Sequence, residues 1–398
     1  MRELAISLYL LLFKFIFTLC RLFPLERKTT FISSFGDNVL YTVKELERMH
    51  SKEKIIILKT PSCREDFSET SATTILFTFT SFIQFVRGIY HIATSRVIMA
   101  DTYFGFLAVT DLKDEVDCVQ LWHAAGALKK FGLMDPSINS RTKNARERFR
   151  TVYSRFTHVV VGSEKMTSIF KRSFGISDDK FIRSGIPRTD FFYQLPVLSK
   201  YEQELTAQFP IIKQKKVILY APTFRDGDLI NPKIHLDLAR MYQELGQEYV
   251  LFMRLHPAVK LDTANLFPNF VYDVSHYKNI NPLLTISDIL ITDYSSIPFE
   301  YSLLNKPMIF YTYDLEEYMQ IRGVEDSYIA ELPGPIVKNT NSLIKTIKFH
   351  QYDMNKVNAF SRNWNTYSKG NASNQLVSIL YEKEQSQRAN VSFQLNEG

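Results

Sequence analysis

The chain alternates short strand-like segments with helix-like segments along most of its length, and this alternation restricts the fold to parallel α/β architecture. In the first half, five segments are short, rich in β-branched residues and bounded by polar or turn residues: 28–35, 54–60, 96–101, 118–123 and 157–163. Helix-like segments separate them at 38–51, 73–93 and 164–174. This half is therefore expected to form a parallel sheet covered by helices.

The same pattern restarts after a segment rich in proline and glycine at 184–196. Strands are expected at 217–222, 249–257, 269–274, 288–293 and 307–314, with helices at 235–246, 280–287 and 295–305. A chain of 398 residues is too long for one ordinary hydrophobic core. The sequence therefore predicts two Rossmann-like domains, 31–200 and 201–388, that face one another across a ligand cleft, followed by a disordered tail at 389–398.

Residues 1–30 are rich in Leu, Phe and Ile, but Lys14 interrupts the apolar run. The longest uninterrupted apolar piece, 4–13, is shorter than the ~20 residues of a spanning helix, and no cleavage site of a secretory signal follows. We expect a helix that lies peripherally on the cytoplasmic face of the bacterial membrane, against an anionic surface, with basic side chains at head-group level: Lys14, Arg21, Arg27 and Lys28. A terminal helix buried on the first domain is the alternative.

Composition and the missing motifs exclude several classes of protein. Three widely spaced cysteines cannot form a disulfide framework or a CxxC metal site. The sequence has no HExxH motif, no Cys/His cluster, no Walker-type lysine loop and no GxGxxG, so we expect no bound metal and no cofactor. A net charge of +6 does not by itself select a partner. The basic residues are dispersed and no RNA- or DNA-binding motif is present, so we expect no nucleic-acid partner.

Polar or catalytic residue types follow four of the predicted strands. These strand ends carry Trp122-His123 before a turn of small residues, Pro222-Thr223, Arg254-Leu255-His256, and Ser295-Ser296 at the start of a predicted helix. Small residues after a strand let a ligand approach the backbone closely, and a histidine at such a position can transfer a proton. The carboxyl ends of parallel strands are where ligands bind in this architecture, so these four sites are the candidates for function.

Ser295, Ser296 and Glu300 each have a simpler structural interpretation beside the functional one. Ser295 and Ser296 would present unpaired helix N–H groups to a phosphate, or merely cap the helix. Glu300, one turn into that helix, would accept hydrogen bonds from a sugar, or lie on a solvated face. Strand alternation points Arg254 and His256 to one side, where they would neutralise a diphosphate. Arg188, at the predicted domain junction, would reach toward a bound ligand.

Four segments share their order and spacing with a known family of enzymes: QLWHAAGALKKFG, LYAPTFRD, RLHP and ILITDYSSIPFEYSLLNKPMIFYTYD. From about residue 96 to 385 the chain resembles the CDP-glycerol glycerophosphotransferases of wall teichoic acid synthesis. The resemblance implies a GT-B-like enzyme that moves glycerol phosphate from CDP-glycerol to a lipid-linked acceptor and releases CMP.

The resemblance also implies roles for individual residues. His123 would be the general base for the acceptor hydroxyl, and His256, with Arg254, would stabilise charge on the departing diphosphate. The remaining substrate contacts would be Trp122, Arg188, Pro222, Thr223, Leu255, Ser295, Ser296 and Glu300.

The sequence departs from the family pattern at one turn. Many members read Trp-His-Gly-Thr-Pro-Leu-Lys, whereas here the turn runs Ala124 to Leu128 and is one residue longer. This turn and the short chain resemble the priming branch, which adds the first glycerol phosphate to the ManNAc of undecaprenyl-diphosphate-linked ManNAc-GlcNAc. A sibling transferase that adds further glycerol phosphate or ribitol phosphate units, and a non-catalytic membrane scaffold, are the alternatives.

Overall fold

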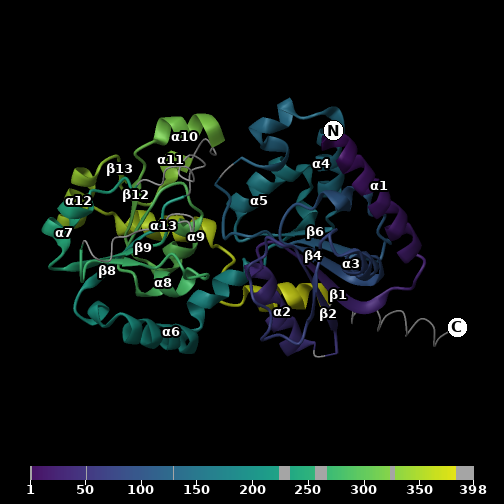
Figure 1. Ribbon diagram of the computed structural model, residues 1–398, viewed down its shortest axis with the longest axis horizontal. Coiled ribbons are helices and arrows are strands. Elements are labelled where there is room, and N and C mark those ends of the chain that lie inside the picture. The colour runs from purple at the N-terminus through teal and green to yellow at the C-terminus, as the bar shows by residue number, and fades with distance from the viewer. Residues whose placement is uncertain are drawn as a thin grey trace. The chain divides into compact units, whose positions relative to one another are not determined.

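The computed structural model describes residues 2–50, 52–128, 130–223, 234–255, 267–322 and 328–381 (Figure 1). These residues group into two compact units. Unit 1 takes the described residues of Met1–Ala124, Phe131–Asp190 and Thr366–Gly398, and unit 2 takes those of Ala125–Lys130 and Phe191–Asn365. Each unit contains one parallel sheet, so the predicted α/β class with parallel sheets is confirmed.

Unit 1 is built on a seven-stranded sheet in the order β3-β2-β1-β4-β5-β6-β7. Its strands are β1 (Glu26–Ser33), β2 (Lys54–Lys59), β3 (Thr73–Leu76), β4 (Ser95–Ala100), β5 (Asp117–Gln120), β6 (His158–Val160) and β7 (Phe181–Ile182). Its helices are α1 (Arg2–Cys20), α2 (Asp37–Met49), α3 (Phe82–Thr94), α4 (Lys143–Arg155) and α5 (Glu164–Phe170). From β1 the chain runs outward to β2 and β3, and it then returns to β4 on the other side of β1. Ligands bind at the carboxyl end of such a switch point.

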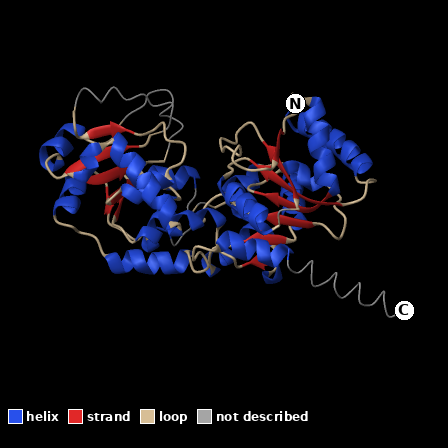
Figure 2. Cartoon of the chain, turned by 90° about the horizontal axis from the view of Figure 1, so that it is seen from below, coloured by secondary structure: helices blue, strands red, loops and turns tan. Residues whose placement is uncertain are grey.

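Unit 2 repeats this plan with six strands in the order β10-β9-β8-β11-β12-β13. They are β8 (Lys216–Tyr220), β9 (Tyr249–Met253), β10 (Val271–Asp273), β11 (Ile289–Thr292), β12 (Met308–Tyr311) and β13 (Ile336–Val337). The helices are α6 (Leu195–Gln208), α7 (Leu238–Leu245), α8 (Asn281–Ile286), α9 (Ile297–Tyr301), α10 (Leu315–Arg322), α11 (Tyr328–Glu331), α12 (Thr340–Lys348) and α13 (Met354–Trp364). Within each unit, Figure 2 shows helices flanking the sheet, and β8 and β11 form the switch point of this one.

The single helix predicted at 73–93 is wrong for its first part. Residues 73–76 form β3, which pairs with β2 through Ile56↔Thr73, and α3 begins only at Phe82. The β-branched Thr73 and Thr74 favour a strand, and an apolar segment of this length does not by itself distinguish a buried strand from a helix. Pairing with the edge of the sheet decided the outcome.

Helix α1 packs one face on unit 1 and leaves the other exposed. Phe13 is fully buried, with its ring centroid 4.7 Å from that of Phe106 and 5.9 Å from that of Phe85 in α3. The opposite face carries an exposed apolar stripe, formed by Leu4, Leu8, Leu11, Phe15 and Leu19. Glu3–Cys20 also reaches the length and mean hydropathy (1.9) of a spanning helix, by composition alone, with 22% of this window buried.

Lys28 does not lie at the surface as the sequence analysis expected. It belongs to β1 and is fully buried, and its Nζ donates to Thr94 Oγ1 over 2.6 Å and lies 3.3 Å from Glu26 Oε1. A buried ammonium group is tolerated only with such partners. Lys28 therefore cannot be one of the basic side chains at head-group level, and that prediction is wrong for this residue.

The described end of the chain returns to unit 1. Tyr367 N donates to Gly162 O (2.9 Å), Ile186 N donates to Ser368 Oγ (3.1 Å), and Tyr381 OH lies 2.6 Å from Thr29 Oγ1. The compact units thus divide after Asp190 and again after Asn365. The domain boundaries predicted at residues 30, 200 and 388 remain predictions, and the tail 389–398 lies outside the described residues.

Candidate active site

Trp122 occupies a strained backbone position directly before His123. Strand β5 ends at Gln120, earlier than the sequence analysis expected, and Trp122 has φ = 61°, which bulky residues rarely adopt. Its N–H donates to Gln120 Oε1 (2.9 Å), and its carbonyl accepts from Asn38 Nδ2 (2.9 Å). Such strain costs roughly 1–3 kcal/mol and is concentrated at functional sites, where neighbouring groups hold it in place.

Arg188 braces the same turn within unit 1. Its Nη1 donates to the carbonyl of His123 (3.1 Å) and lies 3.5 Å from Asp37 Oδ2, while its backbone N donates to Asn38 Oδ1 (3.0 Å). The side chain is only 13% exposed. The structure therefore places Arg188 beside His123, in contact with its peptide group. A contact with substrate remains a prediction.

The imidazole of His123 is stacked and largely desolvated. The ring centroid of Phe35 lies 4.1 Å away with the planes 10° apart, and that of Trp122 lies 4.4 Å away. Burial lowers the pKa of His123 to about 4, so the ring is neutral at pH 7. Its Nδ1 lies 3.3 Å from the carbonyl oxygen of Asp101, which can only accept. Nδ1 therefore carries the proton, and Nε2 is the basic nitrogen.

In unit 2, Asp293 joins the loops that follow β8 and β11. Its Oδ1 accepts from Thr223 N (2.7 Å) and from Tyr294 N (2.6 Å), and the preceding Thr292 donates to Ala221 O (2.7 Å). Pro222 and Thr223 are thereby held beside the segment that contains Ser295. The sequence by itself predicted no role for Asp293. An acidic residue immediately after a buried strand was the signal for this role.

Ser295 and Ser296 precede α9 instead of belonging to it. The helix begins at Ile297, Ser295 Oγ accepts from Ile297 N (3.2 Å), and Ser296 is exposed to solvent. The helix has only five residues and continues as a 3-10 turn. Glu300 is 3% exposed, so the solvated-face interpretation is wrong.

The third strand end of unit 2 carries Arg254 and Leu255. Arg254 Nη2 donates to Lys278 O (3.3 Å), and Leu255 N donates to Ser275 Oγ (2.9 Å), so both contact the loop after β10. His256 lies outside the described residues. The structure thus brings Pro222, Thr223 and Ser295 together through Asp293, and leaves the role of His256 as a prediction.

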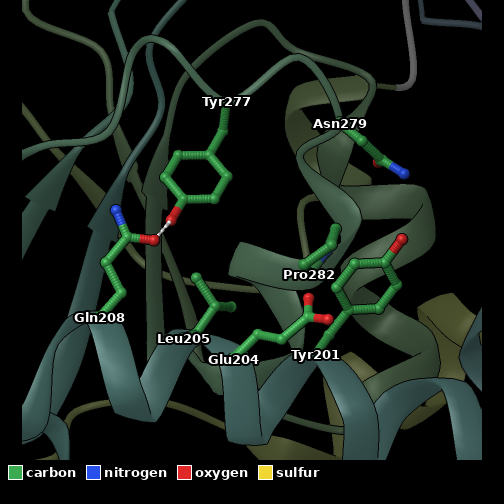
Figure 3. Close-up of a pocket in the computed structure, with 7 residues that line it drawn as sticks. All are labelled: Tyr201, Glu204, Leu205, Gln208, Tyr277, Asn279 and Pro282. Atoms are coloured by element: carbon green, nitrogen blue, oxygen red, sulfur yellow. Dashed lines mark hydrogen bonds between the residues drawn. The ribbon is translucent and has the colours of Figure 1, made fainter.

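A pocket of about 180 Å³ lies between α6 and the start of α8. Figure 3 shows the Tyr277 ring pointing toward α6, where its hydroxyl donates to Gln208 Oε1. The other lining residues are Tyr201, Glu204, Leu205, Asn279 and Pro282. The carbonyl of Tyr277 lies 3.5 Å from Arg254 Nη2, so one loop contributes both to this pocket and to the predicted donor site. No residue of the sequence-based site lines the pocket.

Two units, each built on a parallel sheet flanked by helices, are the architecture of GT-B-like enzymes. The chain belongs to the CDP-glycerol:poly(glycerophosphate) glycerophosphotransferase family, whose model matches residues 16–382. It is 38% identical over 359 residues to the teichoic acid glycerol-phosphate primase of Bacillus subtilis (strain 168), covering 89% of this chain and 92% of that protein. It is 36% identical over 307 residues to the teichoic acid poly(ribitol-phosphate) polymerase of Bacillus spizizenii, covering 74% of this chain and 48% of that protein.

Solved structures agree on the fold. The wall teichoic acid polymerase TagF superposes with a TM-score of 0.77 at 24% identity, covering 96% of each chain. UDP-GlcNAc 2-epimerase from Neisseria meningitidis, bound to UDP-GlcNAc, gives a TM-score of 0.61 at 17% identity and covers 89% of this chain and 99% of its own. Family membership makes the protein a glycerophosphotransferase of teichoic acid synthesis.

Proposed function

We propose that this enzyme transfers the first glycerol phosphate from CDP-glycerol to the ManNAc of undecaprenyl-diphosphate-linked ManNAc-GlcNAc and releases CMP. The reaction rests on one observation, the neutral His123 imidazole with its protonated Nδ1 directed at a backbone carbonyl. The acceptor rests on similarity to the B. subtilis primase along nearly the whole of both chains.

The chemistry balances with groups of this chain. The acceptor hydroxyl oxygen attacks the glycerol-bearing phosphorus of CDP-glycerol, and Nε2 of His123 takes the hydroxyl proton. The bond from that phosphorus to the oxygen bridging the two phosphates breaks, and CMP leaves with the electron pair. Arg254 and His256 would offset the charge that develops on the leaving phosphate. Pro222, Thr223, Ser295, Ser296 and Glu300 would bind the donor, and Trp122, Arg188 and Leu255 would complete the substrate contacts.

Transfer requires the acceptor and the donor to meet. We therefore also propose that they bind in a shared cleft, as expected of a GT-B enzyme. One covalent feature supports it. Residues 125–128 come shortly after His123 in the chain and belong to unit 2, where a Cβ on Gly126 would lie 2.5 Å from the ring of Phe299 in α9. The segment that carries the base thus continues into the unit that carries the proposed donor site.

We also propose that the enzyme works as a peripheral protein on the cytoplasmic face of the membrane, where its lipid-linked acceptor is held. The stripe of Leu4, Leu8, Leu11, Phe15 and Leu19 supports this proposal, because one face of α1 packs on unit 1 while this face is free for the acyl layer. Further exposed apolar side chains lie near the start of α3, namely Leu76, Phe79, Phe82 and Ile83.

The test offers CDP-glycerol and a soluble analogue of the disaccharide-diphosphate lipid to the purified enzyme and weighs the product. One added glycerol phosphate on the bare disaccharide is the expected result, and His123→Ala should abolish it. Reaction only with an acceptor that already carries glycerol phosphate would overturn the priming role. Preference for CDP-ribitol would assign the enzyme to the ribitol branch, and absence of turnover with every donor and acceptor would favour the scaffold.

A further inference from the structure

Asp101 is a buried carboxylate for which the proposed reaction has no use. It directly follows β4 at the switch point of unit 1 and is fully buried. Its Oδ2 accepts hydrogen bonds from the backbone N–H groups of Ser34 (2.9 Å), Phe35 (2.8 Å) and Gly36 (3.0 Å), and from the hydroxyl of Ser33 (3.1 Å). Hydrogen bonds to a charged acceptor are about twice as strong as neutral ones. Asp101 therefore determines the shape of the loop after β1.

The loop that Asp101 holds has little freedom to take another shape. Gly36 has φ = +104°, and a Cβ there would lie 2.2 Å from Cβ of Glu65. Phe35, just before it, is 47% exposed, so burial in the core does not hold its ring in place. The ring nevertheless stacks on His123 with nearly parallel planes. The loop geometry is thus what places Phe35 over the imidazole.

Asp101 also contacts His123 directly, through its carbonyl oxygen. We propose, on the basis of the function given above, that Asp101 and Phe35 are positioning residues for His123. The carbonyl of Asp101 selects the tautomer with Nε2 basic. The carboxylate of Asp101, acting through the 33–36 loop, keeps Phe35 over one face of the ring and water away from it.

Removing the Phe35 ring from the face of the imidazole should change the pKa of His123. Burial is the main reason for its low pKa, Arg188 lowers it further, and Asp37 and the Asp101 carbonyl act in the opposite direction. These are the charged and polar groups that act on the ring from α2, from the 3-10 helix Pro187–Tyr193 and from the end of β4. Water admitted on the Phe35 face should raise the pKa toward the ordinary value of about 6.5.

The experiment measures that pKa in the full-length protein without turnover. Carbon-13 at Cε1 of the eight histidines reports protonation by NMR, and His123→Gln identifies the resonance of His123. Phe35→Ala and Asp101→Asn are each expected to raise the His123 pKa by about one unit or more, and Phe35→Tyr to restore the native value. Phe349→Leu, which alters a 69% exposed phenylalanine of unit 2, serves as the matched control and should change nothing.

Activity provides the second readout. In Phe35→Ala, kcat at pH 5 should fall relative to wild type, about twofold for a rise of one unit in the His123 pKa and more for a larger rise, and should recover at pH 8, because the base is protonated only on the acid side. An unchanged His123 pKa in folded Phe35→Ala would overturn the proposal, even if Asp101→Asn failed to fold. Full activity of His123→Ala would instead refute the general-base role. The NMR measurement would then be the only test of whether Phe35 and Asp101 position His123.

Discussion

At the residue scale, a single glycine shows how a correct sequence signal can have a different cause. The small residues after His123 were interpreted as room for a ligand. In the structure, a Cβ on Gly126 would lie 2.5 Å from the ring of Phe299, so this glycine is required for packing within unit 2. The absence of a side chain is needed there whether or not a ligand binds close by.

Gly126→Ala should therefore be destabilising, and a second glycine offers a matched control. Forcing a methyl group against the Phe299 ring costs about 1–3 kcal/mol when the ring cannot move away. On Gly105, a Cβ would come no closer than 3.7 Å to any neighbour, to atoms of Tyr103. We expect a lower urea midpoint for Gly126→Ala and little change for Gly105→Ala. Equal midpoints for the two variants would show that the Phe299 ring can move away from the added methyl group at little cost.

At the scale of the element, α1 combines the two alternatives that its sequence left open. Phe13 and Phe17 are buried on unit 1, as a terminal core helix requires, while the Leu4–Leu19 stripe is exposed, as an interfacial helix requires. Helical periodicity allows both faces to be apolar. Deleting the segment would remove the packed face and the exposed face together, so substitution on the exposed face is the sharper test of membrane binding.

Replacing Leu8, Leu11 and Phe15 by glutamate should reduce co-sedimentation with anionic vesicles at least tenfold. Each of these side chains contributes about 1.5–3 kcal/mol when it leaves water, and the added carboxylates are repelled by anionic lipid. The control adds the same three charges on the exposed face of α6, at Ser199, Gln203 and Ala207. Unchanged sedimentation of the α1 variant, with folding intact, would contradict the membrane proposal.

At the scale of the whole molecule, the chain does not finish one unit before it starts the other. Residues 366–381 follow unit 2 in the sequence but pack in unit 1, where Asp190 accepts from the N–H groups of Ala372 and Ser373 at 2.8 Å each. Leu376, Val377 and Leu380 are buried there as well. A contiguous two-domain division would leave this helical segment in the second half of the chain.

Unit 1 should therefore lose its stability when the chain ends at Asn365. Truncation removes a buried apolar face and leaves the Asp190 carboxylate without two of its donors, which costs several kcal/mol in total. Urea unfolding followed by fluorescence should show an early transition in the chain 1–365, whereas the chain 1–381 should behave as the full-length protein. Coincident curves for the two truncations would mean that unit 1 is complete without the segment.

Much of the fold followed from local pattern. Buried strands such as β1, β2 and β4 were predicted to within two residues, because β-branched runs bounded by polar residues are local signals. The short strands β7 and β13, of two residues each, were not predicted, because pairing with a neighbour defines them. For the site, His123, Thr223 and Ser295 could be named from their places at strand ends. Phe35 and Asn38 could not, because they come from other segments and act only through contacts. Asp101 ends the predicted strand 96–101, but its hydrogen bonds to the 33–36 loop and its contact with His123 appear only in the folded chain.

The sequence alone determined the α/β class, the strand ends that carry polar residues and the likeness to one family of transferases, because each of these depends on neighbours in the chain. The tertiary structure decided which groups surround the imidazole, why its pKa is low and where residues 366–381 pack. The physical reason is that desolvation and hydrogen bonding depend on segments far apart in sequence, which only the folded chain brings together.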